Sequence, residues 1–312
     1  NVKSNSIACG LNEILTYSFV SPRGVDKINL PADDEKRNFV KIMNPLGEET
    51  SVMRTTLIPN MLDVISTNIS HKVEEVSAFE CGNTFIPQEG LPIETKKYCV
   101  GMYGKEVDFF VLKGVIESVL NNVGLKGYEI EPETTNLTFH PGRCAKIVYN
   151  NIYIGTFGEL HPDVIENYNL GQRVYVAEIN IDTVFENLNL TKSYNPLPKY
   201  PSTSRDIALI VKDEVFVKQI EDIIKANGED LVESYKLFDV YKGAQIEEGH
   251  KSIAYSITYS FIYESSSKRV LKFSFLESFT SFWSKFSSKM TAAATTGPHK
   301  QPLPTSSQPA SV

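Results

Sequence analysis

Apolar positions along the first two thirds of the chain switch between a spacing of two and a spacing of three to four, which predicts strands and helices in turn. The strand-like run "EILTYSFV", Glu13 to Val20, follows a short polar segment that is able to begin as a helix. Apolar residues at every fourth position predict a helix from Leu57 to about His71. A second apolar stripe, from Leu112 to Val123, predicts a helix that ends at Gly124. These patterns favour a mixed α+β module.

The remaining strands of this part are predicted from shorter runs. Asn150 and Asn151 separate two of them, and asparagine tolerates the positive φ of a tight turn, so these two runs form a predicted hairpin. The runs are Val76 to Phe85, Lys97 to Tyr103, Ala145 to Tyr149, Ile152 to Gly158 and Val174 to Ile181.

A polar stretch with three prolines, residues 188–204, "LNLTKSYNPLPKYPSTS", is predicted to be a domain boundary. The elements expected after it are a strand, a helix and two strands: Arg205 to Val211, Val215 to Asn227, Leu231 to Lys242 and Lys251 to Tyr259. This order is three quarters of a ferredoxin-like split βαβ unit. In the last strand apolar and small polar residues alternate, which predicts a sheet covered on one face only.

The chain beyond Ser260 changes in character. Residues 260–290 are rich in serine and aromatic side chains, with Phe275, Phe279, Phe282 and Phe286 at helical spacing, and residues 291–312 have little to pack. We therefore expect three regions: a first domain over 1–190, a second over 191–290 with an atypical last helix and strand, and a disordered tail over 291–312.

Composition and charge narrow the possible functions. The chain has 312 residues, 41% hydrophobic and 22% charged, with a net charge of -7, which excludes bulk basic binding to nucleic acid. The four cysteines form no CxxC pair, which favours reduced thiols in a cytosolic protein. The chain has no secretory leader and no long apolar run, so we expect a cytoplasmic protein without membrane contact.

The most enzyme-like stretches are "FHPGRCAKI" and "GTFGELHP". Cys144 with His140 or His161 would suit a hydrolase, and the two histidines with Glu159 would suit a metal site. Both histidines precede proline, where the chain turns, so structural turn histidines are the favoured interpretation. Gly155 to Gly158 gives only GxxG without the rest of a phosphate-binding loop. No catalytic residue and no metal ligand is therefore assigned.

The linker and second module carry basic and aromatic side chains suited to RNA backbone and base contacts. The candidates are Lys199, Arg205, Tyr241 and Lys242.

Taken together, the ordered motifs resemble the beta-subunit family of bacterial phenylalanyl-tRNA synthetase. The resemblance runs from about Ile7 to Tyr259 and rests on "GLNEILTYSFVSP", "NPLGEETSVMRTTLIPNMLDVISTNI", "FECGNTF", "HPGRCAKI", "IGTFGELHP" and "VYVAEINI", then "YPSTSRDIALIV", "LFDVYKG" and "KSIAYSITY". Each motif is short, but their occurrence in family order is specific.

The resemblance implies an α+β chain: a class II aminoacyl-tRNA-synthetase-like antiparallel core without an active site, followed by a ferredoxin-fold anticodon-binding domain. It implies an α2β2 assembly in which the alpha subunit holds ATP and magnesium and attaches phenylalanine to tRNA(Phe), while this chain binds no cofactor itself. The strand at the position of an arginine-containing motif reads "FECGNTF", without arginine. Arg54 is then a candidate for a polar bond at the subunit interface.

The sequence departs from the family at both ends. The family's N-terminal domains, including the editing domain, have no counterpart in it, so we expect no editing activity, and the tail after Ser260 resembles nothing in the family. The main hypothesis is a non-catalytic beta-subunit fragment that acts as an assembly scaffold and tRNA-binding element. The alternatives are a free-standing Cys/His hydrolase and an RNA-binding protein that works without a partner.

Overall fold

A computed structural model describes residues 1–188, 194, 201–228, 231–243 and 245–260. The chain divides into two compact units, residues 1–192 and 193–312. Each unit has its own hydrophobic core and is described by itself.

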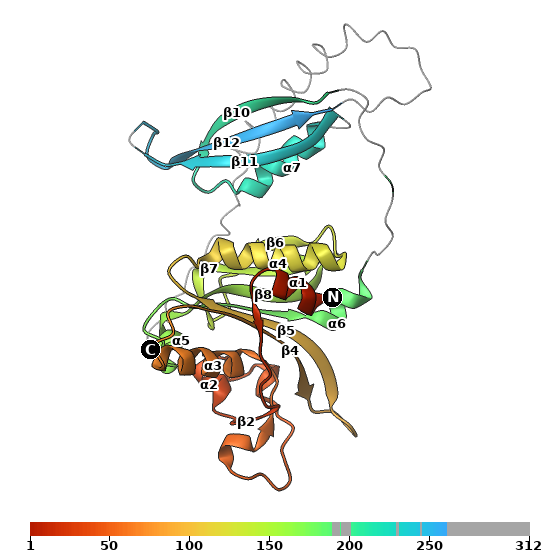
Figure 1. Ribbon diagram of the computed structural model, residues 1–312, viewed down its shortest axis with the longest axis vertical. Coiled ribbons are helices and arrows are strands. Elements are labelled where there is room, and N and C mark those ends of the chain that lie inside the picture. The colour runs from red at the N-terminus through yellow and green to blue at the C-terminus, as the bar shows by residue number, and fades with distance from the viewer. Residues whose placement is uncertain (189–193, 195–200, 229–230, 244, 261–312) are drawn as a thin grey trace, which may run out of the picture. The chain divides into compact units, whose positions relative to one another are not determined.

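The first unit is built on a seven-stranded sheet with the order β1-β4-β5-β9-β8-β7-β6 (Figure 1). Neighbouring strands are antiparallel, except that β1 runs parallel to β4. Its strands are β1 (Asn12–Glu13), β4 (Val76–Ile86), β5 (Ile93–Tyr103), β6 (Glu129–Pro132), β7 (Phe139–Tyr149), β8 (Ile152–Leu160) and β9 (Tyr175–Asn180). A separate two-stranded sheet pairs β2 (Phe19–Val20) with β3 (Val52–Met53).

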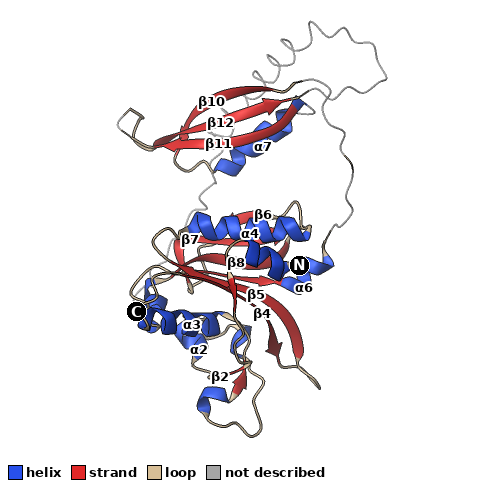
Figure 2. Ribbon diagram, viewed as in Figure 1, coloured by secondary structure: helices blue, strands red, loops and turns tan. Residues whose placement is uncertain are grey.

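Helices cover both faces of the large sheet (Figure 2). One face carries α1 (Val2–Ala8), α4 (Phe109–Val123) and α6 (Ile181–Glu186), and the other carries α2 (Gly24–Lys27), α3 (Ile58–Ser70) and α5 (Pro162–Asn167). Short 3-10 helices span Glu35–Arg37 and Glu48–Thr50. Successive strand residues point to opposite faces of the sheet, and helices cover both faces. The central strands are therefore buried on both sides and are rich in consecutive apolar residues.

Both long helices predicted from the sequence are confirmed. The first, α3, has Pro59 in its first turn, where a missing N–H costs nothing. The second, α4, is capped at its start by Asp108, whose carboxylate accepts a hydrogen bond from the Val111 N–H at 2.8 Å. It ends at Gly124, which has φ of 101° as a left-handed cap requires.

The strand predictions for 76–103 and the hairpin are confirmed, and the strands are longer than expected. Asn150 and Asn151 have φ of 48° and 63° at the tip of the β7–β8 hairpin. The strand predicted over Glu13 to Val20 is wrong, because only its two ends are strands. Between them the chain leaves the large sheet and passes to β3, where the Arg54 N–H donates to the Ser18 carbonyl at 2.9 Å.

The second unit contains β10 (Thr203–Lys212), α7 (Val217–Gly228), β11 (Val232–Tyr241) and β12 (His250–Tyr259). The strands form an antiparallel sheet with the order β10-β12-β11, and α7 packs on one face (Figure 2). This confirms the predicted β-α-β-β order, and among the described residues of this unit only one face of the sheet is covered, by α7. The atypical last helix and strand and the disordered tail were predicted for residues outside the described part of the chain.

Within the described ranges, no helix combines the length and the apolar character needed to span a membrane.

Candidate functional site

A buried ion pair between Arg54 and Glu80 lies where the segment around Thr16 meets strand β4 of the large sheet. The side chains of Arg54 and Glu80 are 3% and 1% exposed, and Nη1 of Arg54 lies 2.9 Å from Oε1 of Glu80. The arginine Nε donates to the Asn83 carbonyl at 2.9 Å, and its Nη1 donates to the Thr16 hydroxyl at 2.8 Å. That hydroxyl donates in turn to Oε2 of Glu80 at 2.7 Å. Almost every polar atom of the pair is therefore satisfied, as a buried charge requires.

The location of Arg54 bears on its predicted role at a subunit interface. Its guanidinium is enclosed by the chain's own groups and has almost no exposed surface. The side chain therefore acts within the unit, where it holds the segment around Thr16 against β4. Any effect on a partner would be transmitted through the position of that segment.

A second buried carboxylate anchors α3 to the middle of the sheet. Oε1 of Glu178 on β9 accepts hydrogen bonds from the Thr56 hydroxyl at 2.6 Å and from the Leu57 N–H at 2.7 Å. The negative charge thus meets the N-terminal end of α3, where it stabilises the helix dipole.

The negative charge of Glu178 acts on two lysines, Lys36 and Lys97. Burial lowers the pKa of Lys36, but Glu178 and other nearby groups outweigh burial and the pKa is raised overall. Burial also lowers the pKa of Lys97, and there it prevails over the attraction of Glu178. The cluster around Glu178 was not predicted from the sequence. A signal for it was present, because a glutamate inside the apolar run "VYVAEINI" is expected to need buried hydrogen-bond partners.

The structure gives the predicted hydrolase residues other environments and partners. Cys144 is 7% exposed, and burial raises the pKa of its thiol to about 12, so it is not a thiolate at neutral pH. Nδ1 of His140 accepts from the Gly142 N–H at 3.1 Å, and Nδ1 of His161 accepts from the Asp163 N–H at 3.2 Å. His161 thus caps the start of α5, whereas His140 lies within strand β7, in the irregular stretch between Phe139 and Cys144.

The carboxylate considered as a metal ligand has other partners. Oε2 of Glu159 lies 2.6 Å from Nε of Arg143, and its Oε1 lies 3.7 Å from Nε of Arg173. Across the described residues no three His, Cys, Asp or Glu side chains gather as a metal site. The GxxG of residues 155–158 lies inside strand β8 and forms no phosphate-binding loop.

The candidate RNA-binding residues of the second unit lie on different sides of the sheet. Register pairs Tyr241 with Ser252, on the face away from α7, whereas Arg205 pairs with Ile257, on the α7 side. The Lys242 ammonium is 2.8 Å from a carboxylate oxygen of Asp213. Lys199 lies outside the described residues.

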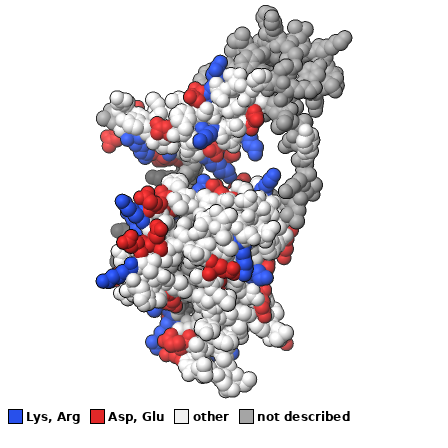
Figure 3. Space-filling view, viewed as in Figure 1, with Lys and Arg blue, Asp and Glu red and all other residues white. Residues whose placement is uncertain are grey.

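The face of this sheet away from α7, the open face among the described residues, carries mainly small and polar side chains together with the exposed Ile210. Besides Tyr241, its register positions on β10, β12 and β11 include Ser204, Asp206, Ala208, Ile210, Lys212, Ser252, Ala254, Ser256, Thr258 and Lys236. Charges of both signs are interspersed over the molecular face seen in Figure 3.

Two family models match the chain in succession. One, described as the phenylalanyl tRNA synthetase beta chain CLM domain, covers residues 1–181. The other, described as the ferredoxin-fold anticodon binding domain, covers residues 198–269.

Curated proteins similar to the chain carry the name phenylalanine–tRNA ligase beta subunit. Those of Clostridium tetani and Clostridium acetobutylicum are each 47% identical over 256 residues, which is 81% of this chain and 32% of each relative. That of Symbiobacterium thermophilum is 37% identical over 265 residues, 81% of this chain and 30% of the relative. The chain thus spans about a third of the length of these relatives.

Proposed function

Because the chain belongs to the beta-subunit family of phenylalanine–tRNA ligase, we propose that it is a non-catalytic scaffold for an alpha subunit and a binding element for tRNA(Phe). The observation that carries this proposal is the succession of the two matched domains in one chain. The reaction served is ATP-dependent attachment of phenylalanine to tRNA(Phe) in an α2β2 assembly in the cytoplasm. The family matches favour this function over a free-standing hydrolase and over an RNA-binding protein that works alone.

We further propose that the first unit is a class II synthetase-like core. In support, it has a largely antiparallel sheet with a short parallel edge strand β1 and with helices on both faces.

We assign ATP and magnesium to the alpha subunit. A triphosphate is bound by arginine side chains that reach its oxygens in pairs. The four central strands β4, β5, β9 and β8 contain no arginine. On other segments, Arg54 is held by Glu80 and Arg143 by Glu159. These charges are neutralised within the chain, which supports a core that does not bind nucleotide.

The surface proposed to meet the alpha subunit is the segment of residues 15–19, which follows β1. Three of its apolar side chains are exposed: Leu15 by 88%, Tyr17 by 84% and Phe19 by 49%. Apolar side chains gathered in this way on a surface are typical of protein–protein interfaces. The hydrogen bonds of Arg54 and Thr16 hold this segment in place from behind.

The test mixes the purified chain with the alpha subunit and measures co-elution in size-exclusion chromatography. The wild-type chain is expected to co-elute, and Tyr17→Ser is expected to weaken the complex at least about tenfold, because an exposed aromatic at an interface is a typical hot spot. Phe110→Ser is the matched control, since Phe110 is 72% exposed at the start of α4, on the opposite face of the sheet from α3. Absence of association between two folded partners would overturn the scaffold role.

The tRNA role is tested separately. Filter binding of tRNA(Phe) to the assembled complex is expected to weaken as salt rises, because phosphate contacts release counterions. An affinity that is independent of salt, or equal for every tRNA, would contradict binding through the anticodon domain.

A further inference from the structure

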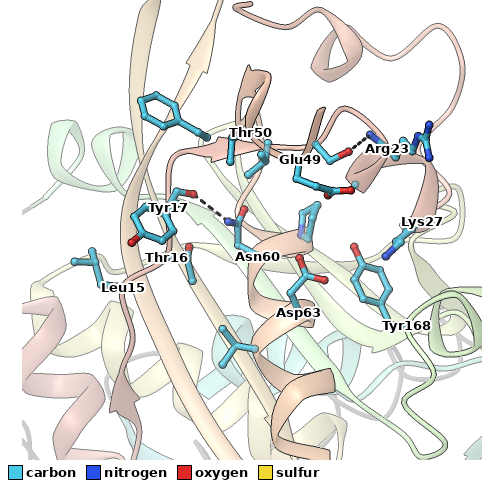
Figure 4. Close-up of a pocket in the computed structure, with 16 residues that line it drawn as sticks. Leu15, Thr16, Tyr17, Arg23, Lys27, Glu49, Thr50, Asn60, Asp63 and Tyr168 are labelled. Atoms are coloured by element: carbon cyan, nitrogen blue, oxygen red, sulfur yellow. Dashed lines mark hydrogen bonds between the residues drawn. The ribbon is translucent and has the colours of Figure 1, made fainter. Parts of the chain in front are cut away.

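A pocket of about 680 Å³ opens beside the segment of residues 15–19. Its walls come from that segment, from the start of α2, from the turn at residues 49–50 and from the first turns of α3. Tyr168, at the end of α5, lines one side of it, near Lys27 and Asp63 (Figure 4). The exposed apolar side chains of Leu15, Tyr17 and Phe19 also line it.

Two oxygen atoms of residues lining the pocket lack a hydrogen-bond partner. Nδ2 of Asn60 donates to the Tyr17 carbonyl at 3.1 Å, which fixes the amide and leaves its Oδ1 unpartnered. The hydroxyl of Tyr168, a side chain only 4% exposed, is also unpartnered. Buried polar atoms are rarely left in this state, because each one costs about 1 to 3 kcal/mol when unsatisfied.

Asp63 lines the same pocket as Asn60 and Tyr168. It is three residues after Asn60 on α3, so both side chains lie on the same face of the helix, and Figure 4 shows Asp63 and Tyr168 turned toward the same space. The Asp63 carboxylate is exposed, and no ion pair or hydrogen bond of the described residues engages it. The pKa of Asp63 is raised overall. Partial burial is the main cause, and the negative charge of Glu49 adds to it, while the positive charge of Lys27 acts in the opposite direction.

The pocket has more carboxylates and hydrogen-bond acceptors than uncompensated positive charges. Arg23 is paired with Glu48 at 3.0 Å, so its positive charge is already compensated. The Lys27 ammonium lies 5.1 Å from the centre of the Tyr168 ring and forms no ion pair with Asp63. One lysine therefore faces two carboxylates, those of Asp63 and Glu49, in addition to the two unpartnered oxygens.

We propose that this pocket is the docking site for an arginine side chain of the alpha subunit, with its guanidinium on Asp63 and its aliphatic stem against Tyr17 and Leu15. The proposal rests on the proposed function, since it takes the alpha subunit as the partner. A guanidinium has five N–H donors in one plane, so it can bind the Asp63 carboxylate and still donate to the two unpartnered oxygens. The ring of Tyr17 offers a surface on which the guanidinium can stack. An anionic group would meet Asp63 and Glu49 and is disfavoured by their charge.

The experiment measures the dissociation constant of the complex between the chain and the alpha subunit by isothermal titration calorimetry. Asp63→Asn is expected to weaken the complex at least about tenfold, because a charged pair is lost in a desolvated interface. Tyr168→Phe keeps the ring, removes the unpartnered hydroxyl and is expected to weaken the complex by a smaller factor. Asp33→Asn, which changes an exposed acid outside the pocket, is the matched control and should leave the constant within a factor of about two.

An alanine scan of the exposed arginines of the alpha subunit then identifies the group that enters the pocket. One arginine is expected to lose its effect on affinity when Asp63→Asn is already present, which is the signature of a direct pair. If the wild-type complex forms and Asp63→Asn binds equally well, the docking site is wrong and the scaffold role stands. If no wild-type complex forms, the proposed function fails and the docking site fails with it.

Discussion

The guanidinium of Arg54 occupies the space directly in front of Gly82, so that a Cβ at residue 82 would collide with Nη2 of Arg54. Gly82 is on β4, two residues after Glu80, and therefore on the same face of the strand. The glycine in "FECGNTF" thus leaves room for the buried ion pair. This relationship explains the residue by packing and requires no left-handed backbone.

Gly82→Ala is expected to destabilise the first unit by about 3 kcal/mol, because the methyl group displaces the guanidinium from Glu80. Chemical denaturation measures this free energy of unfolding. Gly114→Ala is the matched control: Gly114 is exposed inside α4, no atom lies within 4 Å of the added Cβ, and alanine should stabilise the helix by about 0.5 to 1 kcal/mol. Equal effects of the two substitutions would contradict the packing argument.

Removal of both partners of the Arg54–Glu80 pair should cost less than the sum of the costs of removing each partner alone. Arg54→Met leaves the Glu80 carboxylate buried without its counter-charge, for a loss of about 3 to 5 kcal/mol in the free energy of unfolding. The double variant Arg54→Met with Glu80→Leu leaves no buried charge and should be less unstable than the sum of the two single variants by about 1 to 3 kcal/mol. Additive losses in urea denaturation would show that the two side chains are not coupled.

The half-buried thiol of Cys81 and the buried thiol of Cys144 predict a loss of stability at alkaline pH. Burial raises the pKa of Cys81 from 9.0 to about 11 and that of Cys144 from 9.0 to about 12. Above about pH 9 the unfolded chain releases these protons and the folded chain keeps them, so stability is full below the unfolded pKa and falls as the pH rises.

Each thiol contributes a slope of up to about 1.4 kcal/mol per pH unit once the unfolded thiol is ionised. Denaturant unfolding at pH 8, 9 and 10 measures the slope, and the variant with Cys81→Ala and Cys144→Ala should have a shallower one. The same slope in the variant would assign the effect to other groups.

The open face of the second unit is expected to bind RNA through Tyr241. Tyr241→Ala should weaken tRNA(Phe) binding by about 1 to 3 kcal/mol if a base stacks on the ring, and Tyr241→Phe should retain most of the affinity because it keeps the ring. Lys242→Ala should have the smaller effect, because the ammonium is already paired with Asp213. Filter binding at one fixed salt concentration compares the three variants. Equal losses for Tyr241→Ala and Tyr241→Phe would point to the hydroxyl instead.

Much of the secondary structure followed from local patterns. The apolar stripes of α3 and α4, the asparagine pair of the β7–β8 hairpin and the β-α-β-β order after the linker were all readable because each signal lies within a few neighbouring residues. The strand predicted over residues 13–20 was wrong because it, too, rested on a local pattern alone. Its alternation is typical of a strand, but its middle part runs between two sheets and several of its apolar side chains face outward.

The two modules, their order and the family were predictable from the amino-acid sequence, because periodicity, turn residues and ordered motifs each lie within neighbouring residues. The partners of the buried polar residues, in contrast, are set by contacts between distant parts of the chain. Tertiary contacts placed Glu80 opposite Arg54, joined Glu178 to the start of α3 and buried the thiol of Cys144 in the core. These pairings join positions up to 121 residues apart. The energy of a buried charge depends on which groups surround it in space, and spacing along the chain does not contain that information.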